Sequence, residues 1–130
     1  MSFDLAVRYP SANLTNEQAG NLYLQLCEGH LEDVRPHEAI NRFYLAITAL
    51  HPEIDHVSED DIDNLDLCPW SIAFDRSPGH LIMSCVWSKA EYVENLIIKT
   101  ASKHSLAVYN PQTSRYIRPS AKTGEIKVSE

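Results

Sequence analysis

The sequence predicts an α+β fold, a single-domain sandwich in which a mixed or antiparallel sheet of about five strands carries three helices on one face. Strand-like alternation of apolar and polar residues, apolar stripes at helical spacing and turn-forming residues between them lead to this prediction. The expected order is β-α-α-β-β-α-β-β. We expect the domain to span residues 1–119 and residues 120–130 to form a mobile tail, because the tail has few apolar anchors.

The first half of the chain predicts one strand followed by two helices. Residues 3–9 alternate apolar and polar side chains, which indicates a strand with one buried face. Thr15 and Gln18 form a capping box, a reciprocal pair of side-chain hydrogen bonds that begins a helix, and Gly29 favours the end of that helix. A second apolar stripe, with a proline near each end, predicts a helix over residues 36–50.

The second half of the chain predicts four strands and a third helix. The strands are expected at residues 70–74, 80–87, 106–109 and 115–118. The strand over residues 80–87 is apolar on both of its alternating sets, so we expect it to be central and covered on both faces. Ser88 and Glu91 form a second capping box, which begins the helix that follows this strand. The strands before and after this helix are compatible with a parallel crossover.

The acidic segment, residues 53–66, separates the helical first half from the strand-rich second half. Its seven carboxylates are Glu53, Asp55, Glu59, Asp60, Asp61, Asp63 and Asp66. The chain has eighteen acidic and eleven basic residues, so these seven acids account for the whole formal net charge of −7. Concentrated charge bears on partners rather than on fold, and here it favours a basic partner or a cation.

Apolar residues interleave with the acids and are expected to seat the acidic segment on the core. They are Ile54, Val57, Ile62, Leu65 and Leu67. Ser58, followed three residues later by Asp61, is expected to start a short helical turn. Carboxylates fixed in this way focus an electric field better than a mobile tail does. The alternative interpretation is a solvated connector that only keeps the protein soluble.

Composition argues against membrane and nucleic-acid partners. No apolar run is long enough to span a bilayer, and the first ten residues lack the regions of a signal peptide, so we expect a soluble cytoplasmic protein. Cys27, Cys68 and Cys85 are odd in number and far apart, which fits reduced thiols. Six basic residues follow from Lys99 onward, but a net negative chain is a poor general nucleic-acid binder. The oligomeric state is left open.

The sequence contains no strong catalytic or metal-binding motif. It has neither a nucleophile elbow nor a phosphate-binding glycine loop, and it contains only four glycines. Imidazole and carboxylate groups at His51, Asp55 and His56, with Glu53 beside them, leave a small metal-dependent hydrolase as the alternative function, although their spacing matches no strong ligand motif. We therefore predict no catalytic residue, no metal and no cofactor.

Several short motifs match those of a known class of bacterial protein. They are the N-terminal strand SFDLAV, Pro69-Trp70-Ser71, His104-Ser105-Leu106 and Tyr109-Asn110-Pro111-Gln112, the last two within residues 79–119. In these features the chain resembles small immunity proteins of contact-dependent or polymorphic toxin systems, over roughly two-thirds of its length. Asn110 departs from the aspartate that is usual at its position. The resemblance implies a cognate protein toxin as the partner and neutralisation by occlusion.

The prediction for function is therefore a non-enzymatic binding protein, an immunity protein that occludes the active site of a bacterial toxin such as a nuclease. All seven acids of the acidic segment are candidate partner-binding residues, and the toxin is expected to present a basic surface. Carboxylates placed where phosphates would otherwise lie can block the nucleic-acid groove of a nuclease.

Overall fold

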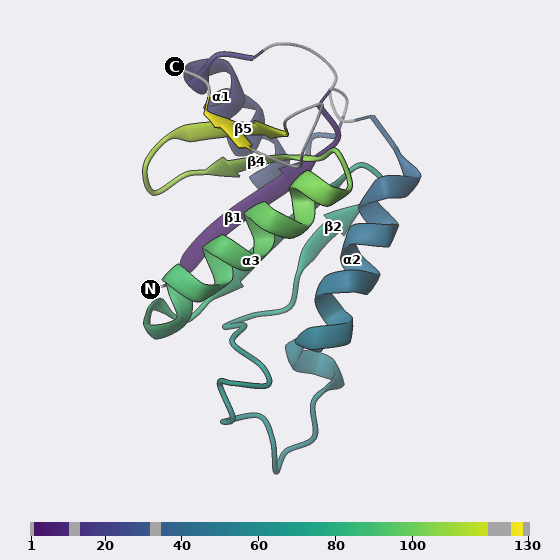
Figure 1. The fold of residues 1–130 in the computed structure, drawn as a ribbon, viewed down its shortest axis with the longest axis vertical. Helices are drawn as coiled ribbons and strands as arrows, with labels where there is room; N and C mark the ends of the chain where they lie inside the picture. Colours follow the sequence, from purple (N-terminus) through teal and green to yellow (C-terminus); the bar gives the residue numbers. More distant parts are fainter. Residues whose placement is uncertain (1, 11–13, 32–34, 120–125, 129–130) are drawn as a thin grey trace.

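The structure, a computed structural model, describes residues 2–10, 14–31, 35–119 and 126–128 (Figure 1). The strands are β1 (Phe3–Arg8), β2 (Asp75–Ser77), β3 (His80–Cys85), β4 (Ala107–Asn110), β5 (Arg115–Pro119) and β6 (Ile126–Val128). The helices are α1 (Asn16–Cys27), α2 (Glu38–Leu50) and α3 (Ala90–Lys103), with short 3-10 turns η1 (Ile54–His56) and η2 (Trp87–Lys89). The predicted α+β fold and its order of elements are confirmed.

The strands form one antiparallel sheet in the order β2-β3-β1-β4-β5-β6. Both β3 and β4 pair with β1 and run antiparallel to it, so they are parallel to each other although β1 lies between them. The helix α3 connects them and passes over β1 (Figure 1). The crossover expected from the sequence is therefore present, with a third strand inserted into it.

Apolar residues cover both faces of the sheet. Leu5 and Val7 of β1 belong to the larger core beneath α2 and α3, whereas Ala6, which points the other way, packs in a second core with residues of α1. The expectation that all three helices pack on one face is therefore wrong for α1. Tyr109 and Tyr116 give the second face enough apolar surface to bury a helix. The sequence does not predict this surface, because the two side chains come together only when β4 pairs with β5.

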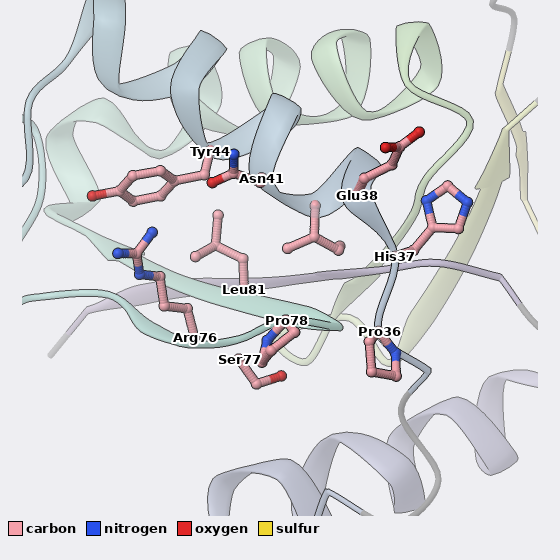
Figure 2. A pocket seen from close by; sticks show the side chains of 10 residues that line it. Pro36, His37, Glu38, Asn41, Tyr44, Arg76, Ser77, Pro78 and Leu81 are labelled. Atoms are coloured by element: carbon pink, nitrogen blue, oxygen red, sulfur yellow. The ribbon is translucent and has the colours of Figure 1, made fainter.

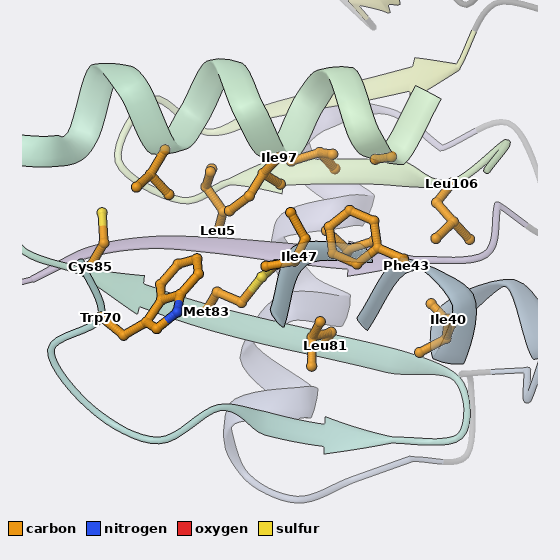
Figure 3. Packing of buried hydrophobic residues seen from close by; sticks show 14 of the residues in the cluster. Leu5, Ile40, Phe43, Ile47, Trp70, Leu81, Met83, Cys85, Ile97 and Leu106 are labelled. Carbon is orange, nitrogen blue, oxygen red and sulfur yellow. The ribbon is translucent and has the colours of Figure 1, made fainter. Parts of the chain in front are cut away.

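The strand β3 is buried along its whole length, as its doubly apolar sequence predicts. Leu81, Met83 and Cys85 contribute to the larger core together with residues of α2 such as Phe43, as Figure 3 shows. Ile82 faces the second core. Cys68 and Cys85 are buried thiols and Cys27 is exposed, and none of the three forms a disulfide.

One of the two predicted capping boxes is present. The Thr15 hydroxyl accepts a hydrogen bond from the Gln18 N–H at 3.1 Å, and the Gln18 side chain accepts from the Thr15 N–H at 3.0 Å. The prediction for Ser88 and Glu91 is wrong. The turn η2 precedes α3 directly, so the N-cap is Lys89, which makes no side-chain capping bond.

The strand predicted at residues 70–74 is displaced toward the C-terminus. Trp70 forms an isolated bridge with Cys85, and the continuous strand β2 begins only at Asp75. Trp70 and Asp75 are five positions apart, whereas their partners on β3 are three positions apart, so two extra residues bulge from the edge. The bulge lets the Phe74 ring pack edge-on against Trp70, with ring centroids 4.7 Å apart.

The C-terminal segment predicted as a tail contributes a sixth strand. Residues 126–128 form β6, which pairs antiparallel with β5 through the register Ile117 to Val128. This strand lies beyond the predicted boundary at residue 119. Residues 120–125 and 129–130 lie outside the described residues, so the prediction of mobility there stays a prediction.

Candidate functional site

The acidic segment forms an ordered loop that joins the end of α2 to the edge of the sheet. It belongs to the teal chain that projects below α2 and α3 in Figure 1. After η1, main-chain hydrogen bonds of 2.9 to 3.1 Å link Ser58 to Asp61, Asp61 to Asn64 and Asn64 to Leu67. The Ser58 hydroxyl also donates to the Asp61 carboxylate at 3.1 Å. The predicted turn at Ser58 is therefore confirmed as the first of three consecutive turns.

Glu53 attaches the beginning of the acidic segment to the body of the protein. One carboxylate oxygen accepts a short hydrogen bond from the Tyr44 hydroxyl, and the other accepts from the main-chain N–H of Phe74 at 3.2 Å. The hydrogen bond to Glu53 raises the pKa of the Tyr44 phenol, and desolvation by burial adds to the increase. Since both oxygens are engaged, Glu53 is a structural acid rather than an exposed docking group.

His51 closes the base of the loop. Its Nδ1 lies 2.9 Å from the Leu67 carbonyl oxygen, which can only accept, so Nδ1 carries the proton. In the tautomer with its single proton on Nδ1, Nε2 accepts a hydrogen bond from the Tyr92 hydroxyl at 2.8 Å. The indole N–H of Trp70 donates to the His51 carbonyl at 2.9 Å. Residues on both sides of the acidic segment are thus joined through one buried imidazole.

Asp66 attaches the end of the acidic segment to the beginning of α3. The Lys89 ammonium donates a hydrogen bond to the Asp66 carboxylate at 2.5 Å. This hydrogen bond, assisted by the positive charge of Lys89, lowers the pKa of the Asp66 carboxyl group. Asp66 is exposed and Lys89 is only partly buried, so solvent screens the pair and it orients the loop more than it stabilises the fold.

The other five predicted site residues are exposed and lie on one continuous stretch of chain. They are Asp55, Glu59, Asp60, Asp61 and Asp63. Ile54 and Val57 pack against the core as expected, but the expectation that Ile62 and Leu65 also seat the segment is wrong, because both are exposed. The segment is therefore pinned at its beginning and at its end, and its exposed acids lie between these attachments.

The alternative hydrolase site is not assembled. His51 is buried and uses both ring nitrogens in hydrogen bonds, whereas Asp55 and His56 lie on the exposed turn η1. Within the described part of the chain, no group of three or more His, Cys, Asp or Glu side chains is positioned to hold a metal ion. The sequence could not exclude His51 as a metal ligand, because the partners of its ring, Leu67 and Tyr92, are distant in sequence.

A groove that sequence reasoning missed lies between α2 and the edge strand β2. It has a volume of about 660 Å³. Figure 2 shows Tyr44 and Arg76 at one end, Pro36 and His37 at the other, and Leu81 between them. The Arg76 guanidinium lies 3.9 Å from the centre of the Tyr44 ring. The walls come from separate segments of the chain, so no local sequence pattern predicts the groove.

Comparison of the chain with family models, with curated proteins and with solved structures gives no match. Among the residues that the structure describes, no helix combines the length and the apolar character needed to cross a membrane. The assignment of a function therefore depends on the two surfaces described above, the acidic segment and the groove.

Proposed function

We propose that the chain is a non-enzymatic binding protein, of the immunity type, that uses its acidic segment to bind and occlude a cognate bacterial toxin with a basic surface, such as a nuclease. In this role it acts in the cytoplasm of the cell that it protects. The observation that carries the proposal is the fixed presentation of five exposed carboxylates on a loop attached at both ends.

Fixed carboxylates favour binding more than mobile ones do. The contacts of Glu53, His51 and Asp66 order the loop before any partner arrives, so little conformational entropy is lost when the complex forms. A dense array of one charge also accelerates diffusional encounter with a surface of the opposite charge. The exposed side chains of Ile62 and Leu65, which interleave with the acids, add apolar area to the same surface.

The proposal is tested with the protein encoded by the neighbouring open reading frame. We expect that protein to carry a toxin domain, and we expect equimolar addition of the chain to abolish its activity. Replacement of Asp60, Asp61 and Asp63 by lysine should lower the association rate constant at low ionic strength by about tenfold or more and flatten its salt dependence, as measured by stopped-flow fluorescence.

A matched control separates local charge from net charge. Each replacement of an acid by lysine adds two charges, so the triple loop variant changes the formal net charge from −7 to −1. Replacement of the exposed acids Glu17, Glu28 and Glu91 by lysine makes the same change elsewhere and should reduce the association rate much less. Equal rates for the two triple variants, or a neighbouring gene of unrelated metabolism, would contradict the proposal.

A further inference from the structure

We propose that the groove between α2 and β2 binds an extended acidic peptide, which adds to the edge of the sheet as a short strand beside Arg76. The proposal uses none of the exposed acids of the acidic segment, so its test is independent of the test of the toxin-binding function. It assigns to the protein a second binding surface, which prefers negatively charged ligands, whereas the acidic segment prefers positively charged ones.

The register of the β2–β3 hairpin determines which main-chain groups face outward. Ser77 lies opposite His80 across a two-residue turn, so the N–H and C=O groups of Ser77 point toward β3. Because these directions alternate along a strand, the main-chain groups of Phe74, Arg76 and Pro78 point away from β3. The outward-facing side is the edge of the whole sheet, because β2 is its first strand.

Contacts within the protein occupy both ends of this edge. The Phe74 N–H donates to the Glu53 carboxylate at 3.2 Å, and the Pro78 carbonyl accepts from the main-chain N–H of His37 at 3.1 Å. By this alternation the N–H and C=O of Arg76, between these contacts, point outward from the edge that the residues flanking α2 approach. An outward-facing pair of this kind forms two hydrogen bonds with one residue of an added strand. The distance from Phe74 to Pro78, roughly 13 Å at the rise of a strand, accommodates a segment of about four residues.

The walls of the groove select the side chains of the added segment. Pro36, Pro78 and the Tyr44 ring offer accessible apolar surface above the buried side chains of Leu81 and Ile40. A groove volume of about 660 Å³ lies within the range of pockets that hold ligands. The Arg76 guanidinium stacks on Tyr44 and has no ion pair with a carboxylate among the described residues. A stacked guanidinium still presents the N–H groups along its edge, which bind carboxylates in a bidentate manner.

His37 lies at the opposite end of the groove, where its ring stacks on Tyr9 with centroids 3.9 Å apart. The Nδ1 atom of His37 accepts a hydrogen bond from the Ala39 N–H at 3.0 Å, so the neutral ring carries its proton on Nε2. Glu38, the acid at this end, is paired with Arg42 at 3.0 Å, which offsets its charge. The groove therefore combines accessible apolar surface with the Arg76 guanidinium. This arrangement fits an extended peptide with a carboxylate opposite Arg76 and apolar residues two positions to either side of it, on the same face.

The test is a titration of the isotopically labelled protein with a blocked peptide of the sequence VTETV, in which the valines lie on the same face as the glutamate, followed by amide NMR. We expect shifts at Arg76, Ser77 and Asn41. A peptide with lysine in place of glutamate should bind at least fivefold more weakly, and so should a peptide N-methylated at the glutamate, which cannot donate to the Arg76 carbonyl.

Two protein variants complete the experiment. Arg76→Gln removes an exposed charge and should weaken binding of the glutamate peptide at least fivefold, whereas Arg115→Gln, on the far side of the sheet, should leave it unchanged. The N-methylated peptide tests the main-chain contact on the unmodified protein. Absence of amide shifts at millimolar peptide, or equal binding of the glutamate and lysine peptides, would overturn the proposal.

Discussion

At the scale of single residues, Glu53 holds the acidic segment to the body of the protein through Tyr44 and Phe74. Glu53→Ala removes both acceptors and leaves two partly buried donors without them. We expect the free energy of unfolding to fall by about 1–3 kcal/mol, measured by urea denaturation. Asp60→Ala, in the exposed part of the same segment, should change it by no more than about 0.5 kcal/mol. Equal effects of the two substitutions would show that Glu53 is not an anchor.

At the scale of elements, the two predicted capping boxes differ in the structure and make a matched pair. Thr15 caps α1, so Thr15→Ala should lower the free energy of unfolding by about 1 kcal/mol. Ser88 lies within η2 and does not cap α3, so Ser88→Ala should have an effect near zero. Urea denaturation of the two variants measures both effects. If Ser88→Ala lowered the free energy of unfolding as much as Thr15→Ala does, Ser88 would cap α3 in solution.

The contrast between these boxes shows how far local sequence determines an element. A capping box needs only residues three apart, so Thr15 and Gln18 contain all the information for the start of α1. At Ser88 the same residue types are present, but the chain leaves β3 in a 3-10 turn that packs the Trp87 ring edge-on against Phe3, with centroids 5.3 Å apart. A tertiary contact accompanies the local conformation there, and the helix begins at Ala90.

At the scale of the whole molecule, α1 covers the second face of the sheet. Gly20 allows a close approach, because a Cβ atom at this position would lie 2.8 Å from the Tyr109 hydroxyl oxygen. Leu26, buried in this second core, and Leu24, exposed on the same helix, make a matched pair. Leu26→Ala should lower the free energy of unfolding by about 2–4 kcal/mol and Leu24→Ala by less than about 0.5 kcal/mol.

Urea denaturation of the two leucine variants tests whether α1 is part of the cooperative fold. A similar small effect of both substitutions would indicate that α1 does not pack on the sheet in solution. A large loss confined to Leu26 would support a sheet that is covered on both faces, with the two cores contributing to one cooperative transition.

The sequence predicted which acidic residues make up the candidate site, but not the contacts that hold them in place. Seven acids within residues 53–66 are visible in the sequence, and six of them are exposed, as expected of a binding surface, with Asp66 paired to Lys89. Glu53 and Asp66 differ from the other acids because they form hydrogen bonds that anchor the loop. Their partners Tyr44, Phe74 and Lys89 lie 9 to 23 positions away from them in the sequence. Local spacing carries no information about such contacts, because they form only when α2, β2 and α3 come together.

By itself the sequence determined the fold class, the order of the elements, the central burial of β3 and the location of the net charge, because periodicity, capping and charge are local properties. Only the tertiary structure decided that α1 covers the second face, that two residues bulge ahead of β2, and that His51 closes the base of the acidic segment. It also created the groove beside Arg76. These features depend on pairing and packing between residues distant in sequence, where burial and hydrogen bonding outweigh local preference.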